Sequence, residues 1–285
     1  KATFKVMTRY VLQIHCPDQT GLIAGTTQVL AKAGANIVDL TQHSAKDIGI
    51  FFLRAVFEID EDKIEEIKNH LDLLSSKLSL TWQIHDCSKK QRLALFVSKT
   101  DHCLYDLLLK QRDGDLDCEF SCIVSNHTVL GPVGGVFGVP FYYVPSNQEK
   151  QIQEDRFREI IAETKSDAVI LARYMQILSP VFTEEFRYKI INIHHGFLPA
   201  FKGAKPYHQA WAKGVKIIGA TAHFATEDLD QGPIIAQDVQ RIPETASIEQ
   251  LVQLGKDIEK RTLSSAVKLW LEHRVFVYEG RTFIL

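Results

Sequence analysis

The sequence has no excess of charge of either sign, and this excludes several classes of protein. Its 285 residues include 33 lysines and arginines and 35 acidic residues, a net charge of -2. Without a basic field, neither nucleic acid nor an anionic membrane is an expected partner. The sequence also lacks the run of ~18 apolar residues that a membrane helix needs, and residues 1–5 lack the apolar core of a signal peptide. These absences predict a cytoplasmic protein.

Cysteines are few and widely spaced. The five are Cys16, Cys87, Cys103, Cys118 and Cys122. An odd, scattered set favours reduced thiols over a disulfide framework. The one close pair, Cys118 and Cys122, has no second pair of ligands nearby in the sequence, so we expect no metal there.

The length and the 45% hydrophobic content allow two globular domains. In the first 86 residues, strand-like and helix-like patterns follow the order βαββαβ. The expected strands are 10–15, 36–44, 49–58 and 80–85, and the expected helices are 22–33 and 64–78. This order is a complete ferredoxin-like unit, so we predict an N-terminal domain over residues 1–86 and a polar linker before a second domain at 92–285.

In the second domain, strands and helices alternate. The expected strands are 92–98, 119–125, 141–144, 167–172, 190–194, 215–224 and 234–241, and the expected helices are 104–111, 149–163 and 247–272. Alternation of this kind predicts a Rossmann-like α/β domain, a mostly parallel sheet with helices on both faces. Ser247 and Gln250 have the spacing of a capping box. A hairpin turning at Glu279–Gly280 is expected at the end of the chain.

An amide and an imidazole lie two residues apart in the predicted strand 190–194. Residues two apart in a strand face the same way, so Asn192 and His194 converge while Ile193 packs inward and His195 points elsewhere. In a parallel sheet, ligands collect beyond the carboxyl ends of the strands. An amide can donate to an oxyanion and an imidazole can carry a proton. We therefore predict that Asn192 and His194 belong to an acyl- or formyl-transfer site.

Two further segments fit such a site. The apolar loop over residues 196–203 is more typical of a pocket wall than of a structural connection. Asp230 lies in the acidic turn 228–233, and its carboxylate can hold an imidazolium or orient a water. A metal site is the competing interpretation, with ligands drawn from His194, His195, His208 and His223. Adjacent strand residues diverge and no His-x-x-x-His helix supports this set, so we expect no metal.

Three separated motifs, residues 175–180, 192–201 and 223–233, resemble those of the folate-dependent formyltransferases. The resemblance implies that Asn192, His194 and Asp230 are the catalytic residues. It also implies that the folate pterin rests against the backbone of two loops. The implied folate-binding residues are Met175, Gln176, Ile177, Leu178, Thr226 and Asp228, with Gln176 replacing an arginine that is usual in glycinamide ribonucleotide formyltransferases.

The segment after the first strand of this domain differs from that of the glycinamide ribonucleotide formyltransferases. They carry a Gly-rich loop there whose amides can hold a substrate phosphate, whereas residues 97–104 contain no glycine. The stretch is similar to that of the formyltetrahydrofolate deformylases, which pass the formyl group to water. Glycines recur at residues 131–138, but without the spacing of a phosphate-binding motif, and we expect a flexible loop.

Residues 16–24 and 34–37 resemble an ACT domain, which the deformylases carry ahead of the hydrolase domain. ACT domains commonly bind small amino acids and pair edge to edge. A ligand, for which the resemblance suggests glycine or methionine, is expected to contact Gly21 and Asn36; assembly without a ligand is the alternative. Open sheet edges make a homodimer or homotetramer the expected state.

Together, these features predict hydrolysis of 10-formyltetrahydrofolate to tetrahydrofolate and formate, in one-carbon and purine metabolism, with no metal or organic cofactor. Two alternatives remain open. The chain could transfer the formyl group to an amine held by Lys99, Asp101 and His102, or it could be a catalytically silent sensor of folate or an amino acid.

Overall fold

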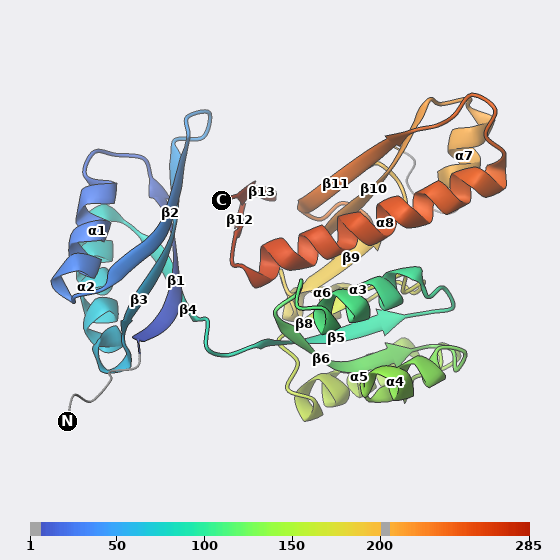
Figure 1. Ribbon diagram of the computed structural model, residues 1–285, viewed down its shortest axis with the longest axis horizontal. Helices are drawn as coiled ribbons and strands as arrows, with labels where there is room; N and C mark the ends of the chain where they lie inside the picture. The colour runs from blue at the N-terminus through green and yellow to red at the C-terminus, as the bar shows by residue number, and fades with distance from the viewer. Residues whose placement is uncertain (1–6, 201–205) are drawn as a thin grey trace. The chain divides into compact units, whose positions relative to one another are not determined.

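The computed structural model describes residues 7–200 and 206–285, without the side chains of 206–208 (Figure 1). The chain divides into two compact units. The first contains the described residues up to Lys90 with His273–Phe276 and Phe283–Leu285, and the second contains Gln91–Glu272 and Val277–Thr282. The linear division predicted from the sequence gave all of 92–285 to the second domain and so differs at the C-terminal residues. In the described part of the chain, no helix is both long enough and apolar enough to span a membrane.

The first unit is a four-stranded antiparallel sheet with the strand order β2-β3-β1-β4. Its strands are β1 (Met7–Pro17), β2 (Asn36–Ala45), β3 (Ile50–Asp60) and β4 (Thr81–Asp86), and its helices are α1 (Leu22–Lys32), the 3-10 turn η1 (Glu61–Lys63) and α2 (Ile64–Leu78). Both α-helices lie along one face of the sheet (Figure 1). The predicted ferredoxin-like order is confirmed.

Alternation along β3 explains both faces of this sheet. Leu53 and Phe57 point into the core beneath the helices. Phe52 points to the opposite face, where its ring stacks on Phe283 at 4.3 Å between centroids and meets the edge of Phe276 at 5.6 Å. The aromatic contacts of that face therefore include residues from the end of the chain.

The second unit is built on a seven-stranded sheet with the strand order β11-β10-β9-β8-β5-β6-β7. Its strands are β5 (Gln91–Val97), β6 (Cys118–Ser125), β7 (Phe141–Tyr143), β8 (Ala168–Leu171), β9 (Ile190–His194), β10 (Ile217–Phe224) and β11 (Ile234–Arg241). Strands β5 to β9 pair in parallel, whereas β10 runs antiparallel to both β9 and β11. The predicted, mostly parallel sheet is confirmed.

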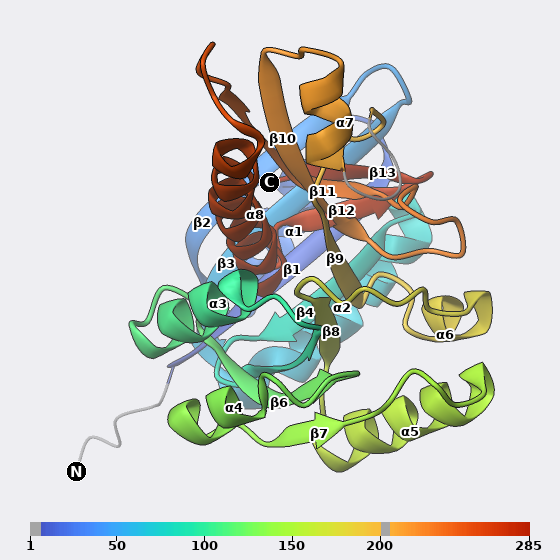
Figure 2. The same cartoon turned by 90° about the vertical axis from the view of Figure 1, so that its right-hand side faces the viewer.

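Helices cover both faces of this sheet. They are α3 (His102–Arg112), α4 (Gly131–Phe137), α5 (Lys150–Glu163), α6 (Pro180–Glu185), α7 (Pro206–Ala212) and α8 (Ile248–Leu271). Figure 2 shows α3 and α8 on one side of the sheet and α5 and α6 on the other. Residues 93–97 of β5 are all buried, as expected for a strand covered on both faces.

The ends of α8 and of the chain agree with the sequence patterns. Ser247 caps α8 and forms the predicted capping box with Gln250. Beyond α8, β12 (Val275–Tyr278) and β13 (Arg281–Ile284) form the predicted hairpin. Its turn residues Glu279 and Gly280 both have positive φ angles, 46° and 75°, which is the twist that a two-residue hairpin turn requires.

The prediction of a flexible loop at residues 131–138 is wrong, because this segment forms α4. Pro132 occupies the first turn, where a missing N–H has no cost. The helix ends at Gly138, which adopts a φ of 68°. Gly134 is required inside it, since a Cβ there would lie 2.6 Å from the carbonyl oxygen of Val139. Gly134 thus permits close packing of the helix against the segment that follows it.

Packing in the core of the first unit predicts how truncation of a core side chain changes the free energy of unfolding. Leu53 is 0% exposed and Leu73, on α2, is 63% exposed. Leu53→Ala should lower the free energy of unfolding by about 2–5 kcal/mol, because it leaves a cavity. The matched control Leu73→Ala should change it by less than about 0.5 kcal/mol. Urea denaturation of both variants measures the difference, and equal midpoints would contradict this account of the core.

Candidate active site

Asn192 and His194 occupy one face of β9 near its end. The strand runs parallel to β8 and antiparallel to β10, and His194 is its last residue. The side chain of His194 is buried, while Asn192 is half-buried. The alternation of the strand therefore presents an amide and an imidazole on the same side of the sheet, as predicted.

Asp230 reaches this pair because the loop after β10 folds back on itself. The backbone N–H of Phe224 donates to the carbonyl of Pro233 at 2.9 Å. Gly232 makes this return possible, since a Cβ there would lie 1.8 Å from the carbonyl oxygen of Phe224. Asp230 itself has a φ of 57°, and its Oδ2 lies 3.2 Å from Nδ1 of His194. The structure thus brings all three predicted catalytic residues together.

His223 is a fourth member of the group, which the sequence indicated only as part of a metal alternative. In the antiparallel register of β9 and β10, His223 lies opposite Asn192. Its Nδ1 lies 2.9 Å from the carbonyl oxygen of Phe224, and its Nε2 lies 3.1 Å from Nδ2 of Asn192. A carbonyl can only accept, so Nδ1 carries the proton and Nε2 accepts from the amide. The amide of Asn192 is thereby oriented, with one N–H bound to His223.

The charges of the group follow from burial and hydrogen bonding. Burial acts to raise the pKa of Asp230, but the hydrogen bond and the charge interaction with His194 outweigh it and hold that pKa below its ordinary value. Burial lowers the pKa of His223. An ionised carboxylate and a neutral imidazole therefore flank His194 and Asn192 near neutral pH.

A cavity of about 320 Å³ opens beside these side chains. Asn192, His194, His223 and Asp230 all line it. The six predicted folate-binding residues line it too: Met175, Gln176, Ile177, Leu178, Thr226 and Asp228. Gln176 donates from Nε2 to its neighbour, the carbonyl of Met175, at 2.7 Å. The cavity has the predominantly apolar walls and few convergent polar groups of a small-molecule site.

His195 also lines the cavity, so the expectation that it points elsewhere is wrong. Strand β9 ends at His194, and the alternation that the expectation assumed does not continue beyond it. Burial, together with the positive charge of Arg173, lowers the pKa of His195 to about 3. It is therefore a neutral imidazole at neutral pH.

A buried polar cluster lies in the same unit, and the sequence did not indicate it. His102, Cys103 and Glu259 place one potential ligand atom each within 4.8 Å of one another. Nε2 of His102 lies 2.8 Å from Oε2 of Glu259, and Nε of Arg173 lies 3.4 Å from the same oxygen. Because the guanidinium of Arg173 already balances the carboxylate charge, the cluster suits an ion-pair network better than a cation site. The contact joins α3 to α8, which no local pattern reveals.

Some residues of the predicted pocket wall and of the alternative metal site lie outside the described part of the chain. The loop expected to form a pocket wall is described up to Ala200. Leu198 is buried there, and its N–H donates to Oγ1 of Thr221 at 3.0 Å. Residues 201–203 and the side chain of His208 lie outside the described residues. The predicted wall stays a prediction.

In the first unit, both predicted ligand positions are at the ends of elements. Gly21 precedes α1 with a φ of 89°, and Asn36 is the first residue of β2. Both are exposed. Binding of an amino acid there, and assembly through the sheet edges, stay predictions. All five cysteines are reduced thiols, as expected.

Comparison with known proteins assigns both parts of the chain. Residues 91–267 match the formyl transferase family and residues 10–72 match the ACT domain family. A formyltetrahydrofolate deformylase from Synechocystis sp. is 43% identical over 276 residues, 96% of this chain and 97% of its own. A crystal structure of a formyltetrahydrofolate deformylase from Pseudomonas syringae pv. tomato matches with a TM-score of 0.92 and 39% identity, over 99% of this chain and 96% of that chain.

A second solved structure is similar over a smaller part of the chain. Glycinamide ribonucleotide transformylase 1 from Symbiobacterium toebii covers 69% of this chain and 94% of its own, with a TM-score of 0.66 and 27% identity. Fold and site thus define an α/β enzyme that joins an ACT domain to a formyl transferase domain. The chain belongs to the formyltetrahydrofolate deformylase family and is a hydrolase.

The neutral state of His195 predicts a pH dependence of stability. Its ordinary pKa is 6.5 and its folded pKa is about 3, so the unfolded chain binds the proton more readily. Stability is then fully present above pH 6.5 and is lost as the pH falls toward 3, by at most about 1.4 kcal/mol per pH unit. Between pH 7 and pH 5 the parent should lose about 1–2 kcal/mol more stability than His195→Asn, because the variant lacks this titrating group.

Urea denaturation at both pH values measures this difference. His43→Asn, at an exposed position on β2, is the matched control and should keep the pH dependence of the parent. An unchanged pH dependence in His195→Asn would show that the imidazole does not contribute.

Proposed function

We propose that this chain hydrolyses 10-formyltetrahydrofolate to tetrahydrofolate and formate. The observation that carries the proposal is the 3.2 Å contact between Nδ1 of His194 and Oδ2 of Asp230, beside Asn192 in a cavity of about 320 Å³. The names of the relatives that match the chain over nearly its whole length support the same reaction. Release of formate and recovery of tetrahydrofolate would place the enzyme in one-carbon and purine metabolism.

The substrate would bind with its pterin against the loops at 175–178 and 225–230. Met175 and Ile177 are exposed although they are apolar, and exposed apolar side chains that line a cavity favour a flat ring. The formyl group would then lie near Asn192 and His194. The proposed reaction uses no metal or organic cofactor.

Each member of the triplet has a separate task. Nδ1 of His194 is held by Asp230, which directs Nε2 away from the carboxylate and toward the substrate. Asn192 has one N–H bound to His223 and can donate its second N–H to the developing oxyanion. Asp230 also positions the attacking water. His194 stabilises the tetrahedral intermediate and assists protonation of the departing nitrogen as the C–N bond breaks.

Transfer to an amine acceptor is less well supported. Such a site was expected to use Lys99, Asp101 and His102. The ring of His102 is bound to the buried Glu259 at 2.8 Å, so it is committed to the internal network rather than presented to a second substrate. A silent sensor would have no need of Asn192, His194 and Asp230 in one cavity.

The reaction predicts formate release with water as the sole acceptor. Purified protein and 10-formyltetrahydrofolate should yield formate and tetrahydrofolate in equal amounts, measured by coupled formate oxidation and by absorbance. Addition of an amine such as glycinamide ribonucleotide should leave the formate yield unchanged. Tight folate binding without formate release would support the sensor instead, and formylation of the amine would support the transferase.

The oxyanion role of Asn192 predicts a large loss of turnover on truncation. Asn192→Ala should lower kcat by about 100-fold or more, because one preorganised donor to the oxyanion is lost. The control Asn69→Ala, at an exposed position on α2, should retain the parent kcat. Steady-state formate release measures both variants. A kcat within about threefold of the parent would remove Asn192 from the mechanism.

A further inference from the structure

The loop at 175–178, which forms part of the cavity wall, is held at its ends and exposed in its middle. Tyr174 and Leu178 are buried in the core of the second unit. Between them, Met175 is 55% exposed and Ile177 is 65% exposed. Core packing therefore holds the residues that flank this segment but not the segment itself. Its shape must come from other contacts.

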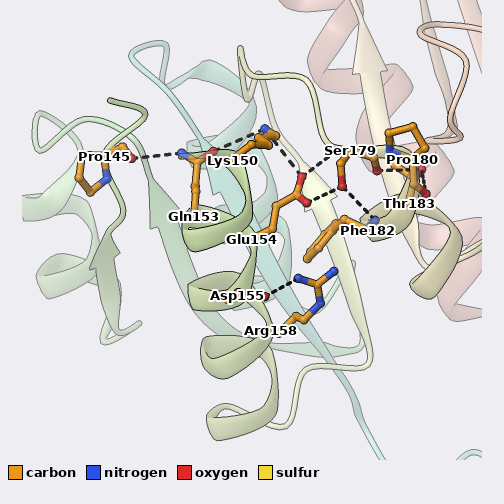
Figure 3. Close-up of polar contacts among 10 residues, drawn as sticks. All are labelled: Pro145, Lys150, Gln153, Glu154, Asp155, Arg158, Ser179, Pro180, Phe182 and Thr183. Carbon is orange, nitrogen blue, oxygen red and sulfur yellow. Dashed lines mark hydrogen bonds and ion pairs between the residues drawn. The ribbon is translucent and has the colours of Figure 1, made fainter. Parts of the chain in front are cut away.

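A buried carboxylate fixes the end of the loop. Glu154, on α5, is 1% exposed. It accepts from the backbone N–H of Ser179 at 2.7 Å and also from the Ser179 hydroxyl. Figure 3 shows Glu154 reaching from α5 to this serine, with Lys150 beside the carboxylate at 3.8 Å. A buried charge is costly unless it is satisfied by hydrogen bonds, and here both bonds go to the residue that follows the loop.

Ser179 transmits this restraint in two directions. Its hydroxyl caps α6 by accepting from the N–H of Phe182 at 3.2 Å. A serine alone can provide that cap. The cap therefore does not require Glu154, and the carboxylate contributes a separate restraint on the backbone between Leu178 and Ser179.

A second buried group fixes the start of the loop. The N–H of Met175 donates to Oγ of Ser98 at 2.9 Å, and Ser98 donates in turn to Oδ1 of Asn126 at 2.7 Å. Ser98 and Asn126 are both buried. Ser98 belongs to the segment after β5 that lacks the glycines of a phosphate-binding loop. Its hydroxyl is used to hold a neighbouring loop.

We propose that Glu154 and Ser98 are positioning residues that set the affinity for the folate substrate by holding the loop at 175–178 in its binding shape. This inference rests on the proposed function. Neither residue is among the described residues that line the cavity, so each would act through the loop. Loss of such preorganisation weakens substrate binding more than it slows the chemical step.

The test is Glu154→Gln, which keeps the size of the side chain and removes its charge. KM for 10-formyltetrahydrofolate should rise about 10-fold, corresponding to one charge-assisted hydrogen bond, while kcat stays within about threefold of the parent. Amide hydrogen exchange at residues 175–179 should become faster, with the rest of the second unit unchanged. Glu159→Gln, at an exposed position on the same helix, should match the parent in both measurements.

A double-mutant cycle separates this role from the helix cap. Ser179→Ala loses the cap both in the parent and in the Glu154→Gln background but keeps its backbone N–H, so a coupling in KM reports the contact between the Ser179 hydroxyl and the Glu154 carboxylate. The proposal expects non-additive changes. A KM for Glu154→Gln within about twofold of the parent would overturn it.

Ser98→Ala gives an independent arm if Glu154→Gln unfolds. It should raise KM with little change in kcat and should accelerate exchange at Met175, whereas a parent-like KM and exchange rate would refute the proposal for this end of the loop. The exchange measurement needs no substrate. If the parent protein released no formate, the proposed function would fail, while parent-like exchange in both variants would be a failure of the loop restraint itself.

Discussion

The antiparallel register of β9 and β10 is the constraint on which the site depends. It sets His223 opposite Asn192, so that the amide and the imidazole share one face of the sheet. A slip of one residue would move His223 to the other face. The register also places Phe224 where the returning loop can bond to it, and Gly232 allows the close approach that brings Asp230 to His194. One strand pairing thus orients both the contact of Asn192 with His223 and the contact of His194 with Asp230.

Sequence patterns predicted those parts of the structure that local physics controls. Alternation in residues 190–194 placed Asn192 and His194 together, and the capping box at Ser247 located the start of α8. The contribution of His223 could not be predicted, because it depends on the register of two strands that are about 30 residues apart in the chain. His195 was misjudged for a local reason: the strand period ends one residue before it. For α4, the glycines favoured a loop in the sequence pattern, whereas Gly134 permits close packing inside a helix.

The segment from Arg173 to Ser179 shows how buried charge can shape an exposed loop. The carboxylate of Glu259 lies 3.4 Å from Nε of Arg173 at one end, and that of Glu154 binds Ser179 at the other. Hydrophobic contacts hold only Tyr174 and Leu178, since Met175 and Ile177 between them are exposed and line the cavity. A carboxylate that is fully satisfied by hydrogen bonds is directional, and it holds backbone in one geometry more strictly than packing does.

The same use of internal hydrogen bonds explains the segment after β5. In a phosphate-binding loop, glycine amides are left free to meet an anion. In this chain, Ser98 is bound to Met175 and Asn126, and His102 is bound to Glu259. These two side chains serve contacts within the unit instead of a second substrate. The segment after β5 thus helps to hold the start of the loop at 175–178 and has no glycine amides to present to an anion.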